Sequence, residues 1–210
     1  MKTTDDFDWD RYTQDYYGRE IFSEYLLKSI PLIISDFKYD NENELVFLDN
    51  LHPNWKELYH VIHQLKVNSI YECGCGCAHH LINNQILNPN LSVNGCDYSY
   101  SQIKLGFTHF NLGSYRFSKN LSVFDMTAIE NVEPLGKHEF VYTQAVTMHL
   151  SYDKARKFLN NMKGLSSKYI YLIENIKAHD YDRLFKEVLP EFKVTKGGKY
   201  INYGFLLEKL

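Results

Sequence analysis

The chain has 210 residues, of which 44% are hydrophobic and 23% are charged. These values are typical of a folded globular domain and exclude a wholly disordered chain. The formal net charge is -3 and no long basic run is present, which argues against a non-specific grip on the nucleic-acid backbone.

The N-terminal segment is acidic and has no apolar core, so the sequence predicts no secretory signal. The best apolar stretch, residues 30–34, is far shorter than the roughly 20 residues that span a bilayer. Three of the four cysteines crowd into residues 73–77, a spacing that does not fit a secreted disulfide framework. We therefore expect a cytoplasmic protein with reduced thiols and without a membrane or nucleic-acid partner.

Residues 1–50 are rich in Tyr, Asp and Asn and have poor periodicity. Ile21, Tyr25 and Leu26 can share one helix face, and the polar residues 40–44 predict a loop. We interpret residues 1–50 as a small helical cap and residues 51–210 as the main domain.

The periodicity sharpens at Pro53, a residue that suits a first helical turn. Apolar residues at 58, 61, 62 and 65 then form one helix face. A strand over 69–73 and a helix over 78–87 follow. The next expected elements are a strand over 91–96, a helix over 100–110 and a strand over 121–124.

A strand over 140–143 leads into a helix-like stretch through residue 150. Ser151 predicts the start of a further helix that ends at Gly164. A strand over 169–173 and a helix over 181–189 come next, and strands over 192–195 and 200–207 flank a Gly-Gly turn, which indicates a hairpin. The alternation predicts an α/β, Rossmann-like fold with a mostly parallel sheet, helices on both faces and an antiparallel C-terminal hairpin.

A Gly-rich loop follows the first strong strand. The dinucleotide fingerprint G-x-G-x-x-G fails here, because its third glycine would fall on His79. The pattern acidic-x-Gly-x-Gly-x-Gly is matched by Glu72, Gly74 and Gly76, with Ala78 in place of the last glycine. A carboxylate at this position suits S-adenosylmethionine, which carries a sulfonium and an ammonium, better than an anionic pyrophosphate.

Acidic residues also close the next two strands. Asp97 can accept hydrogen bonds from two ribose hydroxyls, and Asp125 with Met126 can bind the adenine amino group and ring edge. An Asp that follows a strand can instead form a turn or a helix cap, but three acids at three successive strand ends favour a ligand site.

These stretches resemble the class I S-adenosylmethionine-dependent methyltransferase family over about residues 55–210. The similar segments are SIYECGCG (69–76), NGCDYS (94–99), VFDM (123–126), FVYTQAVTMHL (140–150) and YGFLLEK (203–209). The resemblance implies a seven-stranded sheet with the last strand inserted antiparallel, and S-adenosyl-L-methionine as cofactor. The residues that we assign to that cofactor are Glu72, Gly74, Cys75, Gly76, Asp97, Tyr98, Asp125, Met126, Thr143 and Gln144.

His149 is the first candidate for a general base, because it follows the fourth strand of the family pattern and an imidazole titrates near neutral pH. His179, after the fifth strand, is the second candidate. Either side chain could instead be structural. Tyr17 on the expected cap could stack on the cofactor sulfonium, although such an aromatic residue more often serves simple packing.

Cysteines at 73, 75 and 77 and histidines at 79 and 80 form a cluster that could suggest a metal site. Structural zinc sites use C-x₂₋₄-C spacing, whereas single residues separate these cysteines. We therefore expect no metal.

The leading hypothesis is O- or N-methylation of a small polar molecule, with a sugar or a surface-polysaccharide precursor as one candidate. A non-catalytic S-adenosylmethionine-binding partner subunit is the alternative. A nicotinamide oxidoreductase is disfavoured by His79 and by the C-terminal hairpin. Neither the acceptor nor the oligomeric state follows from the sequence.

Overall fold

The computed structural model describes residues 8–17, 37–42, 44–47, 51–128 and 132–210. The expected helix face of Ile21, Tyr25 and Leu26 lies outside these residues. The described helices are α1 (Trp9–Tyr17), α3 (Pro53–Leu65), α4 (His79–Leu87), α5 (Tyr100–His109), α6 (Tyr152–Leu165) and α7 (Tyr181–Val188). The described strands are β1 (Phe37–Tyr39), β2 (Leu45–Phe47), β3 (Ser69–Cys73), β4 (Ser92–Asp97), β5 (Leu121–Val123), β6 (His138–Gln144), β7 (Ser166–Ile173), β8 (Phe192–Lys196) and β9 (Gly204–Lys209).

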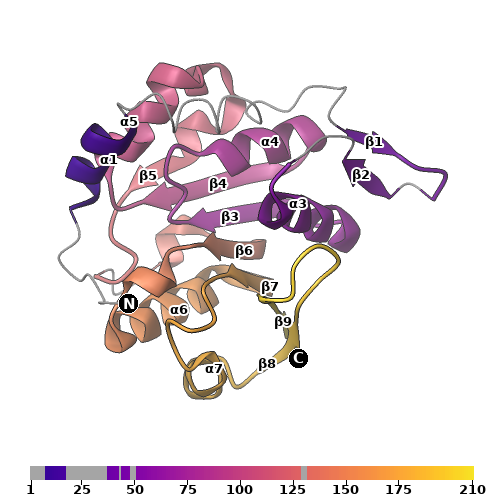
Figure 1. Ribbon diagram of the computed structural model, residues 1–210, viewed down its shortest axis with the longest axis vertical. Helices are drawn as coiled ribbons and strands as arrows, with labels where there is room; N and C mark the ends of the chain where they lie inside the picture. The colour runs from indigo at the N-terminus through magenta and orange to yellow at the C-terminus, as the bar shows by residue number, and fades with distance from the viewer. Residues whose placement is uncertain (1–7, 18–36, 43, 48–50, 129–131) are drawn as a thin grey trace.

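Seven of the strands form one sheet in the order β5-β4-β3-β6-β7-β9-β8 (Figure 1). The pairs from β5 to β7 are parallel, whereas β9 is antiparallel to both β7 and β8. The expected seven-stranded, mostly parallel sheet with its last strand inserted antiparallel is therefore confirmed. The carboxyl ends of β3, β4 and β6 meet at one edge of this sheet, on the left of Figure 1.

Apolar side chains fill both faces of the sheet. In β6, Phe140 and Tyr142 face the core that contains Leu58 of α3, whereas Val141 between them faces the core that contains Leu159 of α6. Consecutive side chains of a strand point to opposite faces, so a central strand that is apolar at every position requires helices on both sides. The predicted helices on both faces are confirmed.

Three segments differ from the sequence prediction. The helix-like stretch after β6 is a single 3-10 turn, Thr147–His149, because backbone N–H groups there donate to a carboxylate that follows another strand. The last strand begins at Gly204, and not at residue 200, because the backbone N–H of Tyr200 donates to the Glu57 carboxylate of α3 at 2.6 Å. The segment expected as a loop, of which residues 40–42 and 44 are described, lies between β1 and β2, which pair as a short hairpin that the sequence did not predict.

Helix α1 lies beside α5, near the carboxyl ends of the parallel strands (Figure 1). Its nine residues are the described helical part of the expected cap, whereas β1 and β2, also within residues 1–50, form a hairpin and not a helix. Within the described ranges, no helix has both the length and the apolar character needed to cross a membrane.

Candidate functional site

The Gly-rich loop between β3 and α4 turns back against the neighbouring strand. The backbone N–H groups of Gly74 and Cys75 both donate to the carbonyl of Cys96, at 2.8 and 2.9 Å. Gly74 and Gly76 have φ values of 79° and 54°, a region in which glycine has no Cβ penalty. The loop predicted to hold the cofactor therefore has the conformation for which its glycines are suited.

Gly74 also lies against the turn that follows β6. A Cβ atom at this position would overlap the Cγ2 atom of Val146. The positive φ and this contact each require glycine, so the loop after β3 and the turn after β6 pack directly on each other.

Ala78, at the third glycine position of the pattern, has a φ of 62° and is fully buried. A left-handed conformation costs a residue with a Cβ atom about 1–2 kcal/mol. The replacement of glycine by Ala is therefore more costly to the backbone than its small side chain suggests.

Glu72 lies near the end of β3 with 2% of its surface exposed. The hydroxyl of Tyr142, on the adjacent strand β6, donates to Glu72 Oε2 at 3.1 Å. Burial raises the pKa of the Glu72 carboxyl, and the nearby Asp97 carboxylate adds to this shift. A cation placed beside the two carboxylates would lower their electrostatic cost.

Asp97 ends β4, the strand next to the loop. Its Oδ2 accepts a hydrogen bond from the backbone N–H of Gly76 at 2.7 Å, and its Oδ1 accepts one from the N–H of Ser99 at 2.8 Å. Burial raises the Asp97 pKa, while these two hydrogen bonds oppose the rise. An ionised carboxylate has about four acceptor positions, so two remain for the hydroxyls of a ligand.

Asp125 and Met126 follow β5 in a turn. Asp125 Oδ1 accepts from both the backbone N–H and the hydroxyl of Thr127, each at 2.7 Å, which is the turn-forming role that an Asp after a strand commonly has. The Met126 side chain is buried in the core, and its carbonyl accepts from the Asn161 amide at 2.7 Å. A ligand at this turn would therefore contact the backbone of Met126 and not its thioether.

Buried polar atoms without a partner gather near this edge of the sheet. Thr143 Oγ1 and Gln144 Oε1, at the end of β6, have no hydrogen-bond partner among the described residues, and neither has Gln102 Oε1 of α5. Buried polar atoms are normally paired. Thr143 and Gln144 were assigned to the cofactor from the sequence, whereas Gln102 was not.

The carboxylate of Glu174, directly after β7, holds the turn that carries His149. Glu174 Oε1 accepts from the N–H groups of Val146 and Thr147 at 2.9 and 3.1 Å, and its Oε2 accepts from Met148 N–H at 3.2 Å. Burial raises the Glu174 pKa to about 7, and the three backbone donors limit that rise. The sequence prediction missed Glu174, because its acidic side chain after a strand gives no local sign of these donors.

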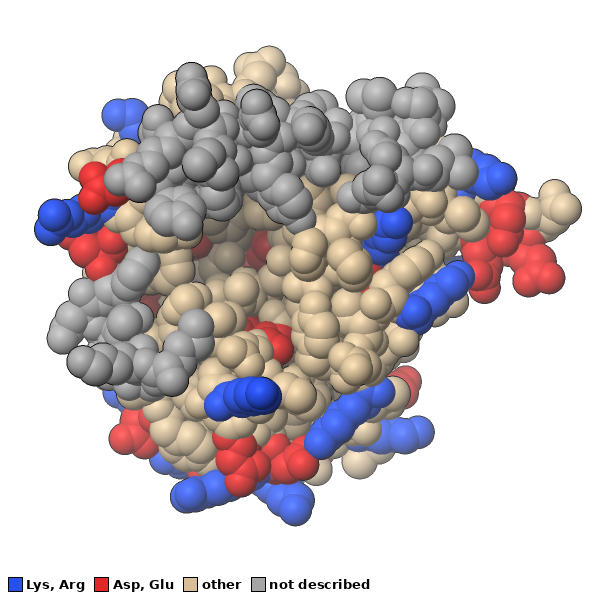
Figure 2. Space-filling view, viewed as in Figure 1, with Lys and Arg blue, Asp and Glu red and all other residues tan. Residues whose placement is uncertain are grey.

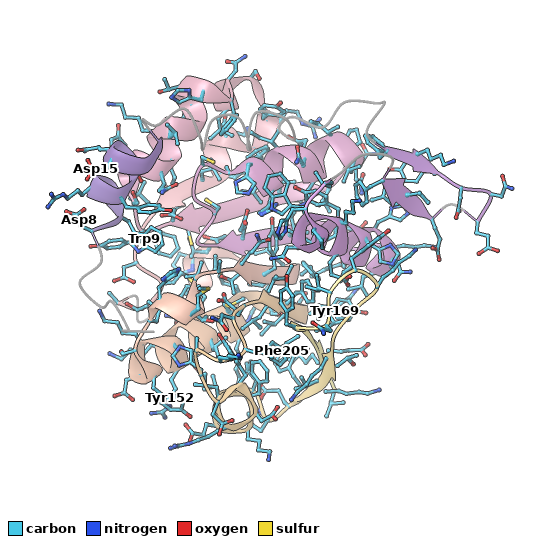
Figure 3. All side chains as sticks on the ribbon, in the orientation of Figure 1. Asp8, Trp9, Asp15, Tyr152, Tyr169 and Phe205 are labelled. Atoms are coloured by element: carbon cyan, nitrogen blue, oxygen red, sulfur yellow. The ribbon has the colours of Figure 1, made fainter. Side chains whose placement is uncertain are left out.

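His149 is half-buried and faces α1. Its ring meets the ring of Trp9 edge to face, with centroids 5.2 Å apart. Figure 3 shows Trp9 on the inner side of α1, whereas Asp8 and Asp15 lie toward the outside. Burial lowers the His149 pKa, which favours the neutral imidazole that a general base requires.

Helix α1 also contacts the segment that follows β4. The hydroxyl of Ser99 donates to Asp10 Oδ1 at 2.5 Å, and the N–H of Ser101 donates to the same oxygen at 3.2 Å. Helix α1 therefore contacts both the segment after β4 and the turn after β6. The sequence prediction of a cap named neither Trp9 nor Asp10.

His179 bonds to the same turn from the segment after β7. Its Nε2 lies 2.8 Å from the carbonyl oxygen of Thr147. A carbonyl only accepts, so Nε2 carries the hydrogen and Nδ1 is the nitrogen with the lone pair in the neutral ring. Any role in proton transfer would therefore fall to Nδ1.

Two further residues assigned to the cofactor, Tyr98 and Cys75, differ in exposure. Tyr98 is 62% exposed, so its side chain lies largely in solvent. The side chain of Tyr17 lies outside the described residues, and its proposed stacking stays a prediction. Cys75 contributes its backbone, since its N–H binds Cys96 and its side chain is buried.

The cysteines of the loop and His80 are buried, and His79 is partly buried. Burial raises the pKa of Cys77 to about 12 and lowers that of His79 to about 4. Cys77 Sγ lies 3.5 Å from His79 Nδ1, while the hydroxyl of Tyr59 lies 3.0 Å from His80 Nδ1. Across the described ranges, no three His, Cys, Asp or Glu side chains come close enough to hold a metal ion.

The surface is hollowed at this place. Figure 2 shows a hollow on the upper left of the face, over the carboxyl end of β3, with Asp or Glu atoms inside it. The Lys and Arg side chains visible on this face lie outside the hollow. The hollow thus combines acidic atoms with the glycine loop.

No protein-family model matches the sequence, and no curated protein is significantly similar to it. Solved structures are similar in fold. Magnesium protoporphyrin IX methyltransferase from Synechocystis PCC 6803, with bound S-adenosylmethionine, has a TM-score of 0.57 at 14% identity, and the match covers 98% of each chain. The chain has the class I methyltransferase fold.

Two further structures support this assignment of the fold. The plantazolicin methyltransferase, in complex with S-adenosylhomocysteine, has a TM-score of 0.59 at 11% identity over 98% of this chain and 92% of that one. The methyltransferase domain of a bacterial Hen1 protein has a TM-score of 0.57 at 11% identity over 75% of this chain and 98% of that domain. At these identities the likeness establishes the fold alone.

Proposed function

We propose that the protein is an S-adenosylmethionine-dependent methyltransferase with its cofactor over the carboxyl ends of β3, β4 and β6. The observation that carries the proposal is the convergence of the glycine loop, the Asp97 carboxylate and buried, unpartnered polar atoms at that edge. In open α/β sheets, ligands bind outside the carboxyl ends of the strands at the switch point. Matches in fold to structures with bound S-adenosylmethionine or S-adenosylhomocysteine support the choice of ligand.

The residues of this edge fit such a ligand chemically. In this proposal Asp97 accepts hydrogen bonds from the ribose, and the segment at Asp125 and Met126 contacts the adenine through backbone groups and a carboxylate. Glu72 favours the cationic end of the cofactor through its charge. Thr143 Oγ1 and Gln144 Oε1 gain the partners that they lack among the described residues. Residues 1–50 act as a cap, of which α1 is the described helix.

When bound, S-adenosylmethionine supplies a methyl group that its sulfonium already activates. The protein then has to orient the acceptor and remove a proton where the acceptor carries one. We assign the removal of this proton to the neutral imidazole of His149. The turn after β6 and the ring of Trp9 hold this imidazole at the edge of the site. His179, through Nδ1, is the second candidate for the same step.

We propose a small polar acceptor that is methylated on oxygen or nitrogen, with sugars as one class to test. The expected small size of the cap supports this class of acceptor, and the net charge of -3 does not favour nucleic acid. Cofactor consumption can be followed as S-adenosylhomocysteine release against a panel of sugars, sugar nucleotides, phenols and amines.

Calorimetry with S-adenosylhomocysteine and with NAD tests the cofactor proposal. We expect heat of binding with the first ligand and none with the second. Binding of NAD alone would overturn the proposal. In the presence of an acceptor, His149→Ala should lower turnover and leave S-adenosylhomocysteine affinity within about twofold. Tight cofactor binding without turnover across the acceptor panel would favour a non-catalytic binding subunit.

A further inference from the structure

Gln102 lies in the first turn of α5, directly beneath the Gly-rich loop. Only 4% of its surface is exposed. Its Oε1 lies 3.4 Å from the position that a Cβ atom on Gly76 would occupy, and this oxygen has no hydrogen-bond partner among the described residues. A buried amide oxygen without a partner costs about 1–3 kcal/mol, so its presence calls for a reason.

The local sequence suggests a structural partner that the fold does not provide. Residues 99–102, Ser-Tyr-Ser-Gln, match the capping box, in which the Gln side chain binds the backbone N–H of the capping Ser. One half of this box forms, since the N–H of Gln102 donates to Ser99 Oγ at 3.1 Å. The other half does not form, because the N–H of Ser99 donates to Asp97 Oδ1 at 2.8 Å. Asp97 thus accepts the hydrogen bond from Ser99 N–H that the Gln102 side chain would accept in a complete capping box.

The side chains of Asp97 and Gln102 both contact Gly76. Asp97 Oδ2 accepts the N–H of Gly76 at 2.7 Å, and Gln102 Oε1 lies beside the α-carbon of that residue. The helix that carries Gln102 is held close to the loop, since a Cβ atom on Gly106 would come within 2.5 Å of the Cys77 carbonyl oxygen. A ligand hydroxyl bound at Asp97 therefore lies next to a second, unoccupied acceptor.

We propose that Gln102 Oε1 accepts a hydrogen bond from one ribose hydroxyl of the cofactor, while Asp97 accepts from the other. This inference rests on the proposed cofactor and adds a residue to its site. Among the hydrogen-bond donors of S-adenosylmethionine, the ribose hydroxyls are the ones assigned to Asp97. Gln102 contacts Gly76, as Asp97 does, so the same hydroxyls are the nearest donors to Gln102 Oε1. The α-ammonium belongs to the opposite end of the ligand, on the side of Glu72.

The test compares Gln102→Leu with the unaltered protein, because Leu keeps much of the volume and removes the acceptor. Calorimetry would use S-adenosylhomocysteine, 5′-methylthioadenosine, and the 2′-deoxy and 3′-deoxy analogues of the latter. Methylthioadenosine retains the ribose and lacks the amino-acid end. Thr108→Val is the matched control, since Thr108 lies on the exposed side of α5 and its hydroxyl bonds only the Lys104 carbonyl in the described structure.

We expect Gln102→Leu to weaken both S-adenosylhomocysteine and methylthioadenosine by a similar factor of about 5 to 30. In the unaltered protein, the deoxy analogue that lacks the hydroxyl bound by Gln102 should have a lower affinity than methylthioadenosine. In Gln102→Leu, this analogue and methylthioadenosine should bind with equal affinity. The comparison is a double-mutant cycle between side chain and hydroxyl. The ligand-free variant should be as stable as the unaltered protein or more stable, because an unpaired acceptor has been removed.

Three results would overturn the assignment of Gln102. These are unchanged affinity for both ligands, a loss with S-adenosylhomocysteine alone, or equal losses for each deoxy analogue in variant and unaltered protein. A fall in ligand-free stability with unaltered affinity would show a purely structural Gln102. If the unaltered protein binds neither S-adenosylhomocysteine nor methylthioadenosine, the proposed function itself fails, and the Gln102 assignment fails with it.

Discussion

Asp97 Oδ2 accepts a hydrogen bond of 2.7 Å from the backbone N–H of Gly76, which lies 21 residues earlier in the chain. The bond joins the end of β4 to the loop after β3, two segments that the parallel pairing of Cys73 with Cys96 brings together. One carboxylate can therefore fix the loop and still present acceptor positions to a ligand. The two functions are separable by experiment.

Replacement of Asp97 by Ala should weaken S-adenosylhomocysteine binding by more than about tenfold, because both the ribose acceptor and the partner of Gly76 are lost. Calorimetry measures the affinity, and urea unfolding measures how much of the change reflects the loop. Asp182→Ala, at an exposed ion pair with Lys196 on the far side of the sheet, is the matched control. Unchanged affinity in Asp97→Ala would show that the ribose assignment is wrong.

Gly74→Ala tests the contact between the loop and the turn after β6. The new methyl group would overlap Val146, and the φ of 79° would be strained. We expect a loss of at least about 1–2 kcal/mol in unfolding free energy and weaker binding of S-adenosylhomocysteine. Both effects should appear in the same variant.

The double variant Gly74→Ala, Val146→Ala separates the two causes. Removal of the Val146 methyl groups should restore the part of the stability that is lost to overlap and leave the backbone strain. Urea unfolding of the single and double variants gives the coupling. If the two substitutions are simply additive, the loop and the turn do not contact each other as described.

The regular elements follow from local patterns. Leu58 and Ile62 of α3 repeat at helical spacing, and both are buried. β6 was predicted from its apolar run, and every residue of its centre is buried. Burial of apolar surface decides these elements, so sequence periodicity is sufficient to find them.

The turn after β6 could not be predicted in this way. Its conformation depends on three donors to Glu174, a residue more than twenty-five positions away. Gln102 was missed for a related reason, since its capping-box partner is taken by Asp97. Such residues are defined by tertiary hydrogen bonds and leave no periodic signal. Glu72, Gly74, Gly76 and Asp97 could be assigned to the proposed site from the sequence, because their spacing is fixed by adjacent parallel strands.

Ala78→Gly should change the stability of the protein little. The left-handed φ of 62° costs Ala about 1–2 kcal/mol, whereas the greater freedom of Gly in the unfolded chain costs about 0.4–1 kcal/mol. Loss of the buried methyl group costs about 0.8 kcal/mol more, so the net change should lie within about 0.8 kcal/mol of zero, measured by urea unfolding. Ala155→Gly in the interior of α6 is the control and should destabilise by about 1 kcal/mol or more. A loss of similar size in both variants would contradict the strain at Ala78.

Glu174 should give the protein a distinct dependence of stability on pH. Burial raises the pKa of this carboxyl from 4.5 to about 7, so the folded protein holds the proton more tightly than the unfolded chain does. Its favourable contribution is complete below about pH 4.5 and is lost as the pH rises to about 7. The change amounts to about 3 kcal/mol.

Glu174→Gln isolates this contribution, because the amide does not titrate and retains one oxygen for the N–H groups of Val146 and Thr147. Urea unfolding would be measured from pH 4.5 to pH 8 in both proteins. The stability of the unaltered protein minus that of the variant should fall by about 3 kcal/mol over this window. The loss of the Met148 bond shifts that difference equally at every pH, and exposed Glu208→Gln should leave its shape unchanged. A difference that is flat, or that rises with pH, would contradict a raised pKa at Glu174.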